Sequence, residues 1–173
     1  MLNNQSHKKE VIQWILTISI ALILSFAIRQ YAFQPCRVQM GSMLPTLREN
    51  DLVLVNKIDY RLHTPIRGDI VIFHPPTLSK DFYIKRVIGV PGDMVEIKDG
   101  FVFINTEKIN EPYLQIETPG IYGPKKLGRD EYFVMGDHRN NSLDSREFGP
   151  IKLGSITGKA FAVIWPFADL KRI

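Results

Sequence analysis

The most constraining feature of the chain is one uncharged apolar run near its N-terminus, from Val11 to Ile28. At about 1.5 Å of helical rise per residue the run spans roughly 27 Å, which is enough to cross the hydrocarbon core of a bilayer. It is apolar on every face, which argues against the striped helix of a soluble core. It is longer than the apolar segment of a cleaved signal peptide, and its one small-x-small match, at 25–27, lies inside it. We therefore predict an uncleaved membrane anchor.

The charges that flank this run leave its orientation almost undecided. Lys8 and Lys9 precede it, and Arg29 and Arg37 follow it, so a count of lysine and arginine on the two sides gives a tie. The positive N-terminal amine favours a cytoplasmic N-terminus by a small margin. The run divides the chain into a tail at residues 1–10, an anchor at 11–29 and one domain at 30–173.

Composition argues against several other classes of protein. The 173 residues carry a formal charge of +4, and this modest excess suits anionic lipid better than nucleic acid, because the basic residues are scattered and form no stripe. Cys36 is the one cysteine, which excludes an intrachain disulfide and a zinc site built from several cysteines. We therefore expect no metal, no other cofactor and no nucleic-acid partner.

Beyond Pro35 the chain is typical of short strands. Asp99-Gly100 is a strong signal for a two-residue hairpin turn, whereas residues 106–130 are polar with several prolines and glycines, which predicts a loop or small insertion. The predicted fold class is mainly β, with one N-terminal transmembrane helix followed by a β-rich domain. The expected strands, rich in valine, isoleucine and phenylalanine, are 51–55, 69–73, 82–90, 94–98, 101–105, 131–135 and 160–165.

Ser42 is a candidate nucleophile, since it stands in the segment Gly-Ser-Met-Leu-Pro at 41–45, a short distance beyond the membrane run. The glycine permits a close backbone approach and the proline stiffens the turn. A serine in such surroundings is more often an ordinary loop residue, and the segment does not match the G-x-S-x-G turn of α/β-hydrolases. A serine hydroxyl also needs a base, and none of the four histidines falls in a recognised triad motif: His7, His63, His74 and His138.

Lys85 is a candidate base, because it lies inside the apolar segment 82–88. Strand alternation places it on the face of Tyr83 and Val87, with Arg86 on the opposite face. Burial disfavours the ammonium form and lowers the pKa of a lysine, so a buried Lys85 could accept a proton near neutral pH. Periodicity alone is more typical of a solvated strand lysine, so both interpretations stay open at this point.

A third cluster of polar residues occupies 136–149, where three acids, two arginines and two serines fall in one short stretch. This composition is as typical of a salt-bridged loop as of a catalytic site.

Taken together, these segments resemble the bacterial type I signal peptidases, which are membrane-anchored serine proteases of the secretion pathway. The matching segments occur in the same order over nearly the whole chain: the anchor, then 41–47 (GSMLPTL), 67–71 (RGDIV), 85–93 (KRVIGVPGD) and 136–146 (GDHRNNSLDSR). The short chain and single anchor are similar to the Gram-positive-style members.

The resemblance implies a β-rich catalytic domain with a serine–lysine dyad. Carried onto matching positions, Ser42 would be the nucleophile and Lys85 the general base, while Ser142 would hydrogen-bond to Lys85 and orient it. The backbone N–H of Ser42 would contribute to the oxyanion hole. Two ion pairs would brace the site, formed by Asp144, Arg146, Asp137 and Arg86.

The resemblance also implies a location and a substrate. The N-terminus would be cytoplasmic and the domain 30–173 would lie on the outer face of the cytoplasmic membrane, in contact with the lipid bilayer through Phe33 and the segment 165–167. Preproteins bearing signal peptides would be the partners, bound extended along a strand edge. Two shallow pockets would accept small residues before the cut, the nearer one lined by Met43, Tyr83 and Ile84.

Two positions depart from the family pattern. Met40 stands where some members carry a serine whose hydroxyl helps to stabilise the oxyanion, although others have glycine there. His138 stands where asparagine is more usual. Cys36 has no expected role.

Two other interpretations of the sequence remain to be compared. The chain could be a catalytically inert, membrane-anchored β-domain that binds a partner. It could also be a self-cleaving peptidase of the repressor type, but those proteins carry a DNA-binding domain where this chain has its membrane run.

Overall fold

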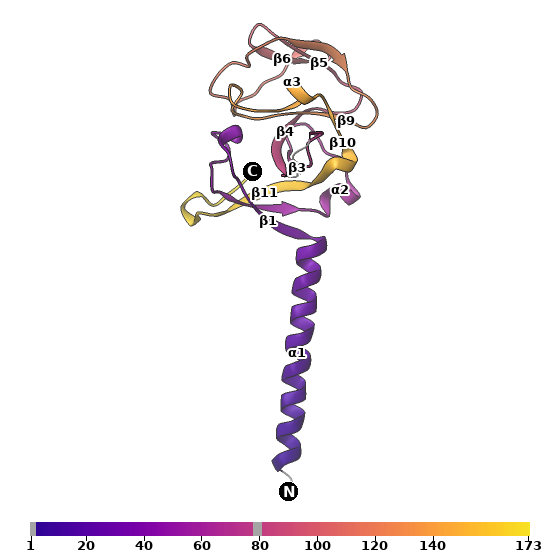
Figure 1. The fold of residues 1–173 in the computed structure, drawn as a ribbon, viewed down its shortest axis with the longest axis vertical. Helices are drawn as coiled ribbons and strands as arrows, with labels where there is room; N and C mark the ends of the chain where they lie inside the picture. The colour runs from indigo at the N-terminus through magenta and orange to yellow at the C-terminus, as the bar shows by residue number, and fades with distance from the viewer. Residues whose placement is uncertain (1–2, 78–80) are drawn as a thin grey trace.

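The computed structural model describes residues 3–77 and 81–173. Helix α1 (Asn3–Tyr31) projects as one rod from a β-rich body (Figure 1). Its segment Lys9–Arg29 is long and apolar enough to cross a membrane, and the side chains of residues 9–26 are exposed. Residues 3–10, expected as a tail, continue the same helix. They contain neither glycine nor proline, and extending an existing helix costs less than nucleating a new one.

The junction between the helix and the body is short. Only Ala32 separates α1 from strand β1 (Phe33–Arg37). The N–H of Ala32 donates to the carbonyl of Ile28, and its own carbonyl accepts from the N–H of Lys57 at 2.8 Å. The anchor therefore joins the body through hydrogen-bonded backbone.

The body consists of two antiparallel sheets. The first has the strand order β1-β2-β11-β3-β4-β9-β10, with β12 beside β11, and the second has the order β7-β6-β5-β8. The remaining strands of the first sheet are β2 (Leu52–Asn56), β3 (Ile70–Phe73), β4 (Tyr83–Gly89), β9 (Glu131–Met135), β10 (Ile151–Lys152), β11 (Ile156–Trp165) and β12 (Lys171–Arg172). Those of the second are β5 (Met94–Lys98), β6 (Phe101–Ile104), β7 (Glu107–Lys108) and β8 (Tyr122–Lys126).

Helices other than α1 are short in the described part of the body. They are α2 (Asp59–Leu62), α3 (Ser145–Phe148), and the 3-10 turns η1 (Gly41–Met43), η2 (Leu153–Ser155) and η3 (Phe167–Asp169). The mainly-β class predicted from the sequence is confirmed.

The predicted hairpin at Asp99-Gly100 is present. Lys98 pairs with Phe101, and both turn residues have positive φ, 52° and 81°, as a two-residue turn of this kind requires.

Five of the described strands were not predicted from the sequence. Three of them, β7, β10 and β12, have only two residues each and leave little pattern. The other two contain residue types that weaken a strand prediction, Pro35 in β1 and Gly123-Pro124 in β8. Both strands lie at the edge of their sheet, where a proline need not donate to a neighbour. The segment 106–130 therefore contributes two edge strands to the second sheet, and its middle part, 109–121, is a loop.

Strand β4 runs through the centre of the body and contacts three buried clusters. Ile84 packs against the cluster around Val53 and Met43, Val87 belongs to the cluster around Phe73, and Ile88 belongs to the one around Phe133. Along the long axis, α1 stands at one end, and α3 with β5 and β6 at the other, while β4 lies between them (Figure 1). A polar side chain on β4 is therefore forced into the interior.

Candidate active site

The turn that carries Ser42 is held from below by apolar side chains. Met43 and Leu47 are fully buried in the cluster beneath η1, and Ser42 itself is 8% exposed. Met43 was expected to line the substrate pocket, but the structure places its side chain in the core instead. The burial of the side chain directly after Ser42 fixes the turn, because the core leaves little room for movement.

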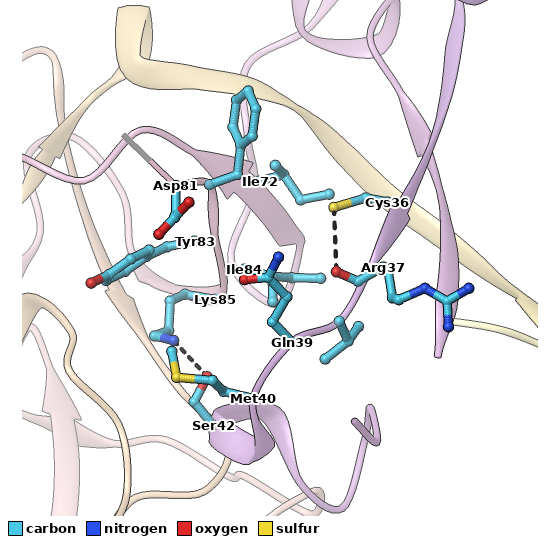
Figure 2. A pocket seen from close by; sticks show the side chains of 12 residues that line it. Cys36, Arg37, Gln39, Met40, Ser42, Ile72, Asp81, Tyr83, Ile84 and Lys85 are labelled. Carbon is cyan, nitrogen blue, oxygen red and sulfur yellow. Dashed lines mark hydrogen bonds between the residues drawn. The ribbon is translucent and has the colours of Figure 1, made fainter. Parts of the chain in front are cut away.

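Lys85 reaches Ser42 from β4. Its side chain is buried, 3% exposed, and its Nζ lies 2.7 Å from Ser42 Oγ (Figure 2). Desolvation lowers the pKa of the lysine to about 8, against a smaller raising effect of the Asp144 and Asp137 carboxylates. The sequence left open whether Lys85 was solvated or buried, and the structure shows that it is buried beside the serine.

The alternation predicted for β4 is also found. Tyr83 and Val87 pack together with the cluster around Phe73, and the Lys85 ammonium lies 5.5 Å from the Tyr83 ring centroid. Arg86 points to the opposite side, where it meets Asp137.

Arg86 and Asp137 form a two-pronged ion pair. Arg86 Nε lies 2.9 Å from Asp137 Oδ1, and Nη2 lies 2.6 Å from Oδ2. Thr46 of the serine turn donates to the same carboxylate, and the Tyr113 ring stacks 4.0 Å from the guanidinium. We call residues 41–46 the serine turn and residues 136–146 the catalytic loop. The ion pair therefore joins the serine turn, β4 and the catalytic loop to one another.

A second ion pair organises the end of the catalytic loop. Asp144 is fully buried; it accepts from Arg146 Nε at 2.9 Å, from the Gly136 N–H at 3.0 Å and from Ser142 Oγ at 2.7 Å. Ser142 was expected to hydrogen-bond to Lys85. Among the described residues it makes no such bond, and its hydroxyl donates to Asp144 instead.

Gly136 brings Ser142 close to the serine turn. A methyl group at this position would overlap both Ser142 Oγ and the carbonyl oxygen of Ser42. Only a glycine permits this approach, so Ser142 stays beside the dyad although it does not bond to Lys85.

Two contacts of the catalytic loop were not anticipated. The His138 N–H donates to the Ser42 carbonyl at 3.0 Å, and its ring Nδ1 lies 3.2 Å from the Gly41 carbonyl oxygen. Arg139 is 1% exposed and pairs with Glu111 at 2.6 Å. The unusual His138 was visible in the sequence, whereas nothing there linked Glu111 to Arg139 across 28 residues.

The dyad opens into an elongated cavity of about 440 Å³ between β1 and the start of β4. Ser42 and Lys85 form one end, and Cys36 and Ile72 lie toward the other (Figure 2). Tyr83 and Ile84 line this cavity, together with Met40, which is 63% exposed. Cys36, for which no role was expected, forms part of the wall, and burial raises the pKa of its thiol.

The site brings a serine hydroxyl and a buried lysine amine together. Within 3–77 and 81–173, no group of three or more histidine, cysteine, aspartate or glutamate side chains is arranged to hold a metal ion. Among the described residues, the buried polar side chains at the site have hydrogen-bond partners.

Comparison with known proteins matches the chain to signal peptidases. Residues 11–165 match the family model described as "Signal peptidase, peptidase S26". Signal peptidase I of Leptolyngbya laminosa is 39% identical, covering 90% of this chain and 80% of that protein. Signal peptidase IB of Staphylococcus aureus strain COL is 35% identical, covering 95% and 94%.

A solved structure agrees with these relatives. The crystal structure of a signal peptidase I from Enterococcus faecalis V583 is similar with a TM-score of 0.50 and 31% identity, covering 56% of this chain and 97% of that one. Together with an apolar N-terminal helix that can cross a bilayer, the matches over most of the chain show that this protein belongs to the membrane-anchored signal peptidases of the peptidase S26 family.

Proposed function

We propose that this chain is a serine endopeptidase that removes N-terminal signal peptides from secreted preproteins, with Ser42 as nucleophile and Lys85 as general base. The observation that carries the proposal is the 2.7 Å contact between Lys85 Nζ and Ser42 Oγ, made by a buried lysine whose pKa is lowered to about 8. A lysine with this pKa is partly neutral at physiological pH and can accept a proton.

The reaction follows from this geometry. Neutral Lys85 takes the proton of Ser42 Oγ as the oxygen attacks the carbonyl carbon of the scissile bond, and the resulting ammonium donates that proton to the leaving amine. The mature protein departs with a new amino terminus, and the signal peptide remains as an ester on Ser42. Lys85 then accepts a proton from a water molecule that attacks the ester carbonyl. The ammonium returns this proton to Ser42 Oγ as the ester bond breaks, and the signal peptide departs with a new carboxyl group.

The negative charge that develops on the carbonyl oxygen needs a donor. Ser42 lies in the short 3-10 turn η1, and its backbone N–H is the donor that we propose for the oxyanion. Met40 precedes this turn with an exposed thioether side chain that has no hydrogen to donate. In this proposal the backbone N–H of Ser42, and not the Met40 side chain, stabilises the negative charge on the carbonyl oxygen.

The cavity has the form that an extended substrate requires. β3 pairs with all of residues 83–86, whereas β9 pairs with β4 only from Arg86 onward. The backbone edge of residues 83–85 on the β9 side is therefore open. We propose that the residues before the cut add a strand along this edge, with a small side chain against Tyr83 and Ile84.

The proposed topology places the N-terminus in the cytoplasm and the body on the outer face. Three aromatic side chains support contact of the body with the bilayer: Phe33, directly after the anchor, and Trp165 and Phe167, which are 47% and 69% exposed. Exposed aromatic residues of this kind favour the headgroup region of a membrane.

Cleavage of a model preprotein by the full-length enzyme in lipid vesicles tests the function. Wild type should release the signal peptide, and Ser42→Ala should not, while it keeps the thermal midpoint of wild type because the lost hydroxyl removes little volume. Turnover by Ser42→Ala at the rate of wild type would refute the dyad. Preprotein binding without cleavage by wild type would instead favour an inert binding domain, a function that gives no reason to bury a lysine.

A further inference from the structure

A second cavity lies next to the catalytic loop and is not used by the mechanism above. It has a volume of about 640 Å³. One wall is the catalytic loop with Asn140, Asn141 and Ser142, and the facing wall is the segment 119–122, where Ile121 is 89% exposed. Arg146 and Glu147 of α3 also line it.

Several polar groups of this cavity are available to a ligand. The side chains of Asn140, Asn141 and Glu147 are exposed, and among the described residues they make no hydrogen bond. The two arginines of the lining are already engaged in ion pairs, Arg139 with Glu111 and Arg146 with Asp144. The available amides can donate to and accept from a peptide backbone, and the available charge is one carboxylate.

One wall of the cavity packs against the turn that carries Ser42. Ser142 lines it, and this residue lies directly beside the Ser42 turn across Gly136. In Figure 1, α3 and the second sheet stand at the end of the molecule opposite α1. A substrate whose apolar segment lies in the bilayer beside α1 reaches Ser42 through the first cavity. Its chain beyond the scissile bond must then leave on the far side.

We propose that this second cavity binds the first residues of the mature protein, immediately after the cut, and that Glu147 gives it a preference for a basic side chain. The proposal rests on the proposed function, because it assigns the leaving part of the same substrate. The asparagine amides bind the backbone, Ile121 packs against a side chain, and the Glu147 carboxylate attracts a cation.

The test uses the full-length enzyme and a set of model preproteins. The substrates are identical up to the cut and carry either lysine or glutamate at one of the second to sixth positions after it. At one of these positions wild type should prefer lysine by about two- to five-fold in kcat/KM at low salt, the range of an exposed charge pair. Glu147→Lys should reverse this preference, and high salt should weaken it in both enzymes.

Glu107→Lys is the matched control, because it makes the same change of charge at an exposed position of the second sheet outside the cavity. It should keep the wild-type preference at every position. The inference is overturned if Glu147→Lys also keeps the wild-type ratios, or if it lowers kcat equally for all substrates, which would show a role in shaping the loop. Failure of wild type to cleave any substrate would refute the proposed function, and this inference with it.

Discussion

The Arg139 guanidinium is completely buried and lies 2.6 Å from the Glu111 carboxylate, which belongs to a segment 28 residues earlier in the chain. Arg139 also donates to the carbonyl of Gly136 and to the hydroxyl of Thr118. The catalytic loop is therefore held on its outer side by the loop 109–121 of the second sheet. The second sheet therefore helps to hold the active-site residues in position.

Glu111→Gln should lower both stability and activity, because it leaves the Arg139 charge buried without its counter-ion. Loss of one partner of a buried pair costs about 3 kcal/mol, and the loosened catalytic loop should lower kcat with little change in KM. Chemical unfolding in detergent micelles and preprotein cleavage measure the two effects. Glu117→Gln, an exposed neighbour in the same segment, is the control and should behave as wild type. An unaltered free energy of unfolding in Glu111→Gln would contradict this role.

Lys85→Arg should be inactive, because arginine keeps its proton at every working pH and cannot act as a base. In wild type, the single-turnover rate should rise with pH through the lysine pKa of about 8, since the neutral form is the active one. The measurement is cleavage of a preprotein from pH 6 to 10. A rate that does not change across this range would exclude Lys85 as the base.

Lys85→Met should be more stable than wild type at pH 7. The unfolded lysine titrates near 10.5 and the folded one near 8, a difference that corresponds to about 3 kcal/mol. Below pH 8 both states are protonated and the cost of burying the charge is fully present. Between pH 8 and 10.5 the unfolded state binds more protons, so the stability of wild type rises with pH.

The free energy of unfolding of both proteins across pH 6 to 11 checks this expectation. The advantage of Lys85→Met should be largest below pH 8 and should shrink toward pH 10.5. Comparison with the variant cancels other groups that titrate in this range. An advantage that is independent of pH would show that packing, and not desolvation of the ammonium, sets the difference.

Cys36 should tolerate a small substitution and not a large one. It lines the cavity at a distance from the dyad and forms no bond to a substrate in the mechanism, so Cys36→Ser should process preproteins at nearly the wild-type rate. Cys36→Trp fills part of the cavity and should raise KM several-fold or abolish binding. Kinetics with one preprotein measure both. Wild-type KM in Cys36→Trp would mean that the substrate does not occupy this part of the cavity.

Local sequence patterns predicted most strands, the hairpin and the anchor, because those features depend on residues close together in the chain. They also indicated which polar residues were unusual. The family resemblance supplied the roles proposed for Ser42 and Lys85, whereas periodicity alone favoured a solvated Lys85. Only the packing of three clusters around β4 shows that this lysine is buried.

The two side-chain expectations that the structure did not match concern residues with a choice of neighbours. Met43 follows the nucleophile, and a pocket or the core could equally take its side chain. Ser142 was expected to bond to Lys85, and it bonds to the Asp144 carboxylate. The contact between Glu111 and Arg139 joins two loops, for which no periodicity exists.

The short junction at Ala32 has a consequence for the choice of cleavage site. Since the anchor passes into β1 through one hydrogen-bonded residue, we expect a bilayer that holds α1 to limit how far the body can rise or tilt, and therefore to hold Ser42 at a set height. The distance between the bilayer and Ser42 would then be fixed. Among several bonds with acceptable side chains, we expect it to select the one that the length of chain beyond the bilayer brings to that height.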